Sequence, residues 1–452
     1  MVPKVKIWCK QPEVEITERH RYATYVAFEA ILEWEVAWCA EEEQEPENGV
    51  VRIQYGGAKT DAPIGAFWIP ASDLLSSTGV NVNAWEWSHA EVTPGRIRLP
   101  FGVRQERQGV IESDWLSWVF WMASRMEECG SRNNDFRDSF GRFKGSASLA
   151  HQEGWLEHPI LEKCVRAWAR KFVPDLPLPI GYRVQPTVDV DSAFAYRYKG
   201  LKLTIAASLN DFIRGRWARF LERPWVMLGF KDDPYDTYKW LEQEHAKVGL
   251  RATYFFLLAN RGKRDRGVPW NASELKQRIE GLKSSADIGI HPGCAAHDDS
   301  DDVTMFEEIR RLTRILKTPV QGSRQHYLLQ RIPESWRRLE RLEIKTDHSL
   351  GYADSVGFRA GMSRPFRAYD LTDERIMNLV LHPVAVMDAT LMRHLKLSPA
   401  EALKLVDDLS CNVREVEGVM VLLWHNESVS NYWQWKGWKT FYQEVLATVV
   451  LK

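Results

Sequence analysis

Long apolar runs and an excess of charge of either sign are both missing from this 452-residue sequence. No 18 consecutive residues are free of charge, so the sequence predicts no membrane span, and its first residues lack the apolar core of a secretory signal. The 60 basic residues nearly cancel the 61 acidic ones, which argues against a nucleic-acid or membrane-surface protein. We therefore expect a cytoplasmic protein with no nucleic-acid partner. The sequence leaves its oligomeric state open.

Paired cysteines are missing as well. CxxC spacing does not occur, which argues against both a disulfide framework and a structural zinc site and fits a reducing compartment. Tryptophan, by contrast, is abundant, with 20 residues; these side chains serve either core and interface packing or stacking on sugar rings. The six cysteines are Cys9, Cys39, Cys129, Cys164, Cys294 and Cys411.

The length predicts two domains, because one hydrophobic core rarely organises so many residues. Residues 1–180 form the first, a mixed α/β unit with expected helices at Tyr22–Ala37, Asp114–Glu128 and Pro159–Phe172. Three prolines, from Pro174 to Pro179, mark the boundary. The aromatic-rich helices of this unit need cover, so we expect it to pack on the second domain, residues 181–452.

The second domain alternates apolar runs with amphipathic segments, which is typical of an α/β fold with a parallel sheet. This pattern alone does not distinguish a doubly wound sheet from a (β/α) barrel. The expected strands are Arg183–Val190, Ala252–Leu258, Ile288–His291, Val320–His326, Leu379–Val386 and Val419–Trp424. The expected helices are Thr237–Val248, Ser273–Lys283, Thr304–Leu316, Glu334–Leu342 and Pro399–Val413.

Polar residues close four of these apolar runs. Parallel strands bring their carboxyl ends to one edge of a sheet, so these side chains are expected to lie close together. Asp189 and Asp191 share one face of a strand, because side chains two apart point the same way. One could ligate a divalent cation while the other acts as a base; a pair of aspartates that caps a turn is the structural alternative. The other runs end in His291, in Arg324-Gln325-His326-Tyr327 and in His425.

These motifs resemble the NodB-homology polysaccharide deacetylases, a family similar to carbohydrate esterase family four. The segment from Thr187 to Ser192, TVDVDS, resembles their TFDDG-like motif, in which the first Asp is the base and the second a metal ligand. His291 matches part of their HxxxH metal motif, and Ser323–Tyr327 is similar to the RxPY motif, whose Arg orients the base. Gly418–His425 resembles their closing strand, which ends in the general acid.

Further segments resemble a bacterial branch of that family that carries an N-terminal domain of unknown function. The resemblance implies a distorted (β/α) barrel of about seven parallel strands, similar to a TIM barrel. It also implies a metal-dependent hydrolase of carbohydrate metabolism. The resembling segments are Lys231–Tyr235, Thr346–Gly361, Met387–Leu391 and Trp424–Asn426, together with Ala123–Glu128 and a stretch beginning at Gly141.

One metal ligand of the family is absent. If His291 opens HxxxH, the second imidazole should stand at position 295, which is alanine. His326 could supply the missing nitrogen, His297 could do so instead, or neither does, and then water, substrate or no metal at all occupies the place. The expected ion is a divalent metal, zinc, held by Asp191, His291 and His326.

The resemblance implies N-deacetylation of an amino sugar or glycan precursor. Asp189 would be the base, oriented by Arg324, and His425 the acid; the Tyr327 backbone N–H is a candidate donor to the oxyanion. Two alternatives remain open: a non-catalytic or regulatory protein that binds glycan or protein, and a hydrolase of a non-sugar amide. Expected substrate contacts are Arg359, His382 and Trp424, although Arg359 could equally form a structural salt bridge and His382 could be a structural residue.

Overall fold

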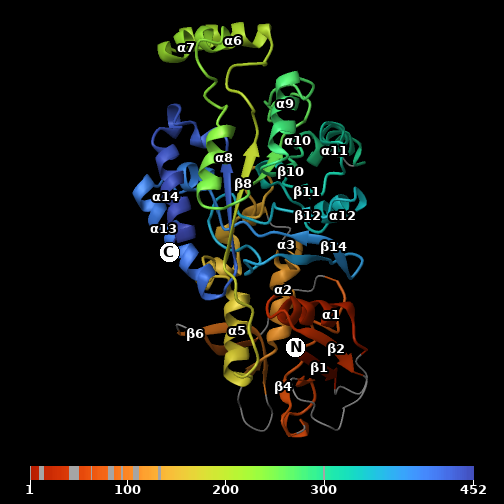
Figure 1. Cartoon of the computed structure of the whole chain (residues 1–452). Helices are drawn as coiled ribbons and strands as arrows, with labels where there is room; N and C mark the ends of the chain where they lie inside the picture. Colours follow the sequence, from red (N-terminus) through yellow and green to blue (C-terminus); the bar gives the residue numbers. More distant parts are fainter. Residues whose placement is uncertain are drawn as a thin grey trace.

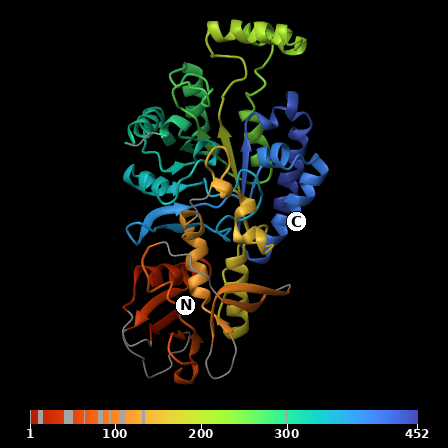
Figure 2. The same cartoon turned by 180° about the vertical axis from the view of Figure 1, so that it is seen from behind.

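The computed structural model describes residues 2–451 apart from 10–14, 40–49, 63, 80–85, 93–94, 105–110, 131–133 and 299–300. Two small sheets belong to the N-terminal part of the chain, and one large sheet belongs to the rest. Figures 1 and 2 show the small sheets at one end of an elongated molecule and a projecting pair of helices at the other. The large sheet lies between them.

The N-terminal part contains more strand than the sequence indicated. The expected helix Tyr22–Ala37 ends at Ala30, and Glu35 already begins a strand, because Glu33 takes a positive φ between them. One sheet is parallel, in the order β2 (Glu35–Cys39), β1 (Lys4–Cys9), β3 (Val50–Tyr55) and β4 (Phe67–Ile69). The other is antiparallel, with β5 (Glu86–Val92), β6 (Gly95–Arg104) and β7 (Ile111–Ser113).

Helices accompany these two sheets. The expected helices Asp114–Glu128 and Pro159–Phe172 are confirmed in outline, the first as two shorter helices. Asp114 caps the first of them by accepting from the backbone N–H of Ser117. The elements are α1 (Glu18–Thr24), a π-helix (Tyr25–Ala30), α2 (Trp115–Ala123), α3 (Met126–Gly130), α4 (Leu149–Gln152) and α5 (Ile160–Phe172).

The large sheet confirms the α/β class. Eight of its nine strands run parallel, and β13 pairs antiparallel with β14. Its order has two ends, β13 and β15, with no ladder between them among the described residues, so closure into a barrel stays a prediction. The order is β13 (Phe366–Asp370), β14 (Arg375–Leu381), β12 (Thr346–Asp347), β11 (Gly322–Ser323), β10 (Asp287–Ile290), β9 (Thr253–Phe256), β8 (Arg183–Val190), β16 (Val419–His425) and β15 (Val386–Met387).

All five helices expected in this part are present within two residues of their predicted ends. The clearest start is that of α13, where Ser398 and Glu401 form a capping box with Pro399 in the first turn. No helix among the described residues is both long and apolar enough to cross a membrane. The helices are α6 (Leu201–Ile213), α7 (Trp217–Met227), α8 (Tyr238–Lys247), α9 (Ser273–Leu282), α10 (Cys294–Asp298), α11 (Val303–Leu316), α12 (Glu334–Arg341), α13 (Pro399–Glu415) and α14 (Trp438–Leu451).

Buried polar contacts join the N-terminal part to the segments around the large sheet. Glu128 forms a two-pronged ion pair with Arg359, and both side chains are buried. Glu162 accepts hydrogen bonds from the backbone N–H groups of Ser363 and Arg364 at 2.8 and 2.7 Å. Residues 1–180 therefore pack against the rest of the chain, whereas a domain boundary at residue 180 stays a prediction.

Candidate functional site

The carboxyl ends of four parallel strands bring the polar side chains together. Asp189 lies on β8 directly opposite His425 of β16 in the strand register. His291 follows the last residue of β10, and Arg324 follows the last residue of β11, which pairs with it. Because the strands are parallel, these residues meet at one edge of the sheet. The positions of these residues at the ends of the apolar runs predicted this arrangement.

Asp191, His291 and His326 form a group that could hold a metal ion. Their ligand atoms all lie within 4.8 Å of one another. Oδ1 of Asp191 is 3.2 Å from Nε2 of His291, and Oδ2 is 3.5 Å from Nε2 of His326. A tetrahedral ion with bonds of about 2.1 Å would separate its ligand atoms by about 3.4 Å. The two observed separations are close to this value.

Hydrogen bonds on the far side of each ring turn its Nε2 toward Asp191. Nδ1 of His291 lies 2.6 Å from the carbonyl oxygen of Arg324, which can only accept, so Nδ1 carries a proton, and in the neutral ring Nε2 keeps a lone pair. Nδ1 of His326 donates to the carboxylate of Asp265 at 2.9 Å. Partners of this kind fix the tautomer and ring orientation of metal-ligating histidines.

Two polar atoms in this group are buried without a hydrogen-bond partner among the described residues: Oδ1 of Asp191 and Nε2 of His291. Both are acceptors in the tautomer just derived, and they face each other at 3.2 Å. Leaving two such atoms unsatisfied is costly, and a cation between them would satisfy both. The donor set, two imidazoles and one carboxylate, suits zinc, so the residues fit the metal that the sequence implied.

His297, the alternative ligand, lies on α10 and belongs to neither group of potential ligands found among the described residues. The second of these groups is Asp265, Cys294 and His326. Its carboxylate accepts from the backbone N–H of Cys294 at 3.0 Å as well as from His326. Asp265 is thus fixed by the start of α10. The geometry therefore brings His326, and not His297, to Asp191 and His291.

The charges around His326 affect its proton. Burial disfavours the charged ring, but the carboxylates of Asp191 and Asp265 outweigh burial and raise the pKa of His326 well above its ordinary value. Without a metal these carboxylates therefore favour a proton on Nε2. A cation bound by Nε2 must displace that proton, since only neutral imidazole is a ligand.

Asp189 is held by a buried guanidinium. Nη1 of Arg324 donates to Oδ1 of Asp189 at 3.0 Å and to Oγ1 of Thr187 at 2.7 Å, while Nε donates to the carbonyl oxygen of His348. Arg324 is completely buried. The second oxygen of Asp189 lies 3.9 Å from Nε2 of His291, next to the metal-type group. One oxygen is thus anchored and the other faces the cluster.

His425 is oriented by a carboxylate that the sequence did not single out for a role. Its Nδ1 donates to Oδ1 of Asp388 at 2.8 Å, and its backbone N–H donates to the other oxygen at 2.7 Å. Nε2 lies 4.0 Å from Oδ2 of Asp191. Burial lowers the pKa of His425, but Asp388 outweighs it and raises the pKa to about 10. The ring is therefore protonated at neutral pH, with Nε2–H toward the cluster.

Tyr327 stands at the rim of the cluster with a positive φ of 60°. Its ring stacks on His326 with centroids 4.2 Å apart and on Phe140 with centroids 5.4 Å apart. Nη1 of Arg142 donates to its carbonyl oxygen at 2.7 Å. Residues of the N-terminal part thus reach the rim of the site. The role of the Tyr327 N–H as an oxyanion donor stays a prediction.

Three expected substrate contacts do not join the cluster. Arg359 is buried against Glu128 and is not available to a substrate, so the salt-bridge alternative describes it. Trp424 is fully buried, and its ring centroid lies 5.1 Å from that of Tyr442. Neighbouring residues of a strand face opposite sides of the sheet, and His425 takes the inner side.

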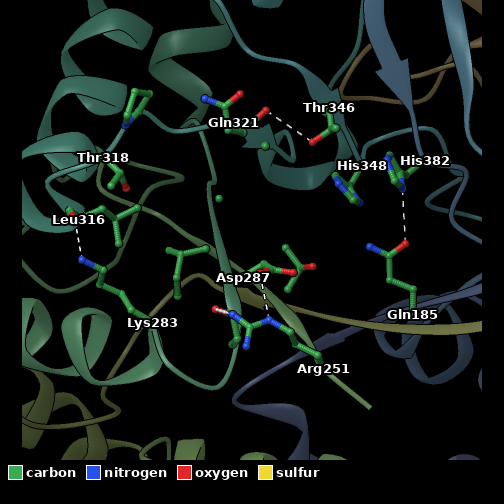
Figure 3. A pocket seen from close by; sticks show the side chains of 16 residues that line it. Gln185, Arg251, Lys283, Asp287, Leu316, Thr318, Gln321, Thr346, His348 and His382 are labelled. Carbon is green, nitrogen blue, oxygen red and sulfur yellow. Dashed lines mark hydrogen bonds and ion pairs between the residues drawn. The ribbon is translucent and has the colours of Figure 1, made fainter. Parts of the chain in front are cut away.

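His382 follows the last residue of β14 and does not join the cluster either. It stacks on His348 at 4.1 Å and contacts Gln185, which stands four residues before Asp189 on β8. Figure 3 shows these three residues in a pocket of about 400 Å³, lined by residues that precede or begin β9 and β10, such as Arg251 and Asp287. The lining of this pocket does not include Asp189, Asp191, His291 or His425.

Sequence comparison matches residues 11–174 to a family of unknown function, DUF7033. No curated protein matches the chain. The chain is similar in structure to a putative polysaccharide deacetylase from Mycobacterium smegmatis, with 16% identity over 61% of this chain and 86% of that one and a TM-score of 0.39. A polysaccharide deacetylase from Bacillus cereus gives 12% identity over 59% and 86%, with a TM-score of 0.29.

A CE4 family pseudoenzyme from Bacillus anthracis is also similar, with 11% identity over 59% of this chain and 61% of that one and a TM-score of 0.28. None of these likenesses places the chain in a family.

Proposed function

We propose that the chain is a divalent-metal-dependent hydrolase of an amide, with an N-acetylated amino sugar as substrate. The observation that carries this proposal is the meeting of a metal-type group, an anchored carboxylate and an oriented imidazolium at one edge of the sheet. Asp191, His291 and His326 would hold the ion. When bound there, a zinc ion would polarise the amide carbonyl and lower the pKa of water.

Asp189 is assigned the role of base. Its free oxygen faces the cluster while Arg324 fixes the other, so the carboxylate can take a proton from attacking water without turning away. Among the described residues, the side chain of Arg324 contacts Asp189, Thr187, the carbonyl oxygen of His348 and the ring of Phe255, so it acts as a positioning residue. The N–H of Tyr327 is proposed as a donor to the developing oxyanion, because the residue stands at the rim beside His326.

His425 is assigned the role of acid. Its Nε2–H points toward the cluster, and Asp388 stabilises the charged ring until the proton is delivered to the leaving amine. The base and the acid come from neighbouring strands, β8 and β16, and a scissile bond between them would meet one on each side. Residues 1–180 are proposed to form a separate domain that supplies part of the rim.

Three substitutions test this assignment together. Asp191→Ala should abolish zinc binding in a titration against a chromophoric chelator. Asp189→Asn should keep the zinc and lose acetate release from N-acetylglucosamine oligomers, because a base acts on a proton and not on the ion. His425→Ala should keep the zinc and slow turnover by about 10²–10⁴-fold. Wild-type protein that binds no divalent ion at micromolar concentration and releases no acetate contradicts the proposal.

A further inference from the structure

The helical hairpin α6–α7 stands apart from the rest of the molecule. It is inserted between β8, which carries Asp189, and α8. Figures 1 and 2 both show it projecting beyond the large sheet at the end opposite the N-terminal part. The hairpin turns at Gly215, whose φ of +63° is readily adopted only by glycine. Glycine at this position therefore favours the sharp turn between α6 and α7.

The hairpin exposes large apolar side chains to an unusual degree. Of the 23 large hydrophobic side chains that are exposed among the described residues, 12 lie between residues 201 and 230. Scattered exposed hydrophobic residues are normal, but a contiguous set marks a binding surface. The set is Leu201, Leu203, Ile205, Leu209, Phe212, Ile213, Trp217, Leu221, Trp225, Met227, Leu228 and Phe230.

Six of these side chains form one stripe on each helix. On α7 the exposed stripe runs through Trp217, Leu221 and Trp225, at helical spacing. The opposite face of α7 points to the body, where Arg219 lies 3.8 Å from the ring of Trp433 and Arg223 lies 5.0 Å from that of Tyr196. The apolar stripe therefore faces away from the protein that could have covered it.

Leu201, Ile205 and Leu209 make the matching stripe of α6, with Phe212 packed against Trp217 across the turn. Helices with tryptophan, phenylalanine and leucine on an exposed face are typical of elements that lie in a membrane interface.

The charge of the hairpin distinguishes between two possible partners of its apolar surface, a second copy of the chain and a lipid bilayer. From Leu201 to Lys231 the chain carries six basic and two acidic residues, whereas the whole chain has a net charge of −1. Lys202, Arg214 and Lys231 are exposed at the two ends of the hairpin. Two copies packed hairpin to hairpin would bring like charges together. An anionic bilayer is complementary in both respects, apolar below its headgroups and negative at its surface.

We propose that the α6–α7 hairpin docks the protein on an anionic lipid bilayer, its apolar stripes entering the interface and its basic ends meeting lipid headgroups. The hairpin lies at the carboxyl end of the sheet, where Asp189, Asp191 and His425 also lie. Docking therefore turns that end of the molecule toward the membrane surface. The proposal does not depend on the chemistry assigned to the cluster.

Co-sedimentation with vesicles tests the proposal on the full chain. Wild-type protein should bind phosphatidylcholine vesicles containing 30% phosphatidylglycerol, bind pure phosphatidylcholine more weakly and lose affinity as salt rises. The triple variant Trp217→Ser, Leu221→Ser, Trp225→Ser should lower the partition coefficient by about 100-fold or more. The control is Val303→Ser with Phe306→Ser, which removes exposed apolar side chains from α11 and should bind as wild type does.

A second variant guards against misfolding of the first. Lys202→Gln with Arg214→Gln leaves the apolar stripes intact and should weaken binding to the anionic vesicles by about 30-fold at low salt, with little change on pure phosphatidylcholine. The proposal is overturned if the wild-type protein binds neither kind of vesicle. The proposal is also overturned if analytical ultracentrifugation shows that the wild-type protein is a dimer and the triple serine variant a monomer. In that case the apolar stripes of two copies would pack against each other.

Discussion

His326→Ala is the substitution that most sharply tests how the metal-type group is built. The structure brings three potential ligands together, with their ligand atoms within 4.8 Å of one another. Zinc sites with four protein ligands bind with about 10–16 kcal/mol, so one ligand contributes about 3 kcal/mol, or roughly 100-fold in affinity. His326→Ala should therefore raise the dissociation constant for zinc by about 100-fold, measured by competition with a chromophoric chelator at pH 8.

His297→Ala is the matched control, because it removes the same side chain three residues from Cys294 on α10. It should leave zinc affinity within about threefold of wild type, since His297 lies outside the groups of potential ligands. Asp265→Asn should fall between the two, at about 10–100-fold, because it weakens the partner that orients His326. Equal losses in His297→Ala and His326→Ala, or no loss in either, would refute the ligand set.

Three further predictions concern stability, measured as the free energy of unfolding in urea. Glu128→Ala should lower the free energy of unfolding by about 3–5 kcal/mol, because it leaves the buried charge of Arg359 without its partner. The double variant Glu128→Ala, Arg359→Met should recover part of this loss, and no recovery would contradict the ion pair. Burial lowers the pKa of His245 from 6.5 to about 4, so its neutral ring stabilises the fold above pH 6.5 and this contribution, up to about 3 kcal/mol, is lost as pH falls toward 4. His245→Gln should flatten the stability curve between pH 7 and 5, and an unchanged slope would assign the loss elsewhere. Gly357→Ala should cost at least about 2 kcal/mol, because a Cβ there would lie 2.1 Å from a backbone oxygen at a φ of +109°; wild-type stability would contradict this contact.

Much of the cluster could be predicted because it depends on a local rule. Polar residues that end apolar runs in parallel strands must meet, and this rule gave Asp189, Asp191, His291 and His425 without any knowledge of the helices. The same rule would have given Asp388, which follows the two-residue strand β15, had that strand been separated from β14 at Pro383. Trp424 faces the core, and not the cluster, because neighbouring residues of a strand face opposite sides and His425 takes the inner side.

Other features left no local signal. Asp265 lies in a loop among basic residues, and only the packed structure shows that it meets His326. Arg359 pairs with a residue 231 positions away, a distance at which sequence patterns carry no information about contact. The basic hairpin was hidden for another reason: a near-zero net charge over the chain averages out a local excess of six basic over two acidic residues from Leu201 to Lys231.

The contact between Tyr327 and the N-terminal part bears on how the protein could diversify. Phe140 stacks on Tyr327, and Arg142 donates to its carbonyl oxygen, so the short stretch that carries both residues forms part of the rim beside His326. Exchange of this stretch between relatives would change the rim while Asp191, His291 and His326 stay the same. Selectivity and chemistry would then be inherited from different parts of the gene.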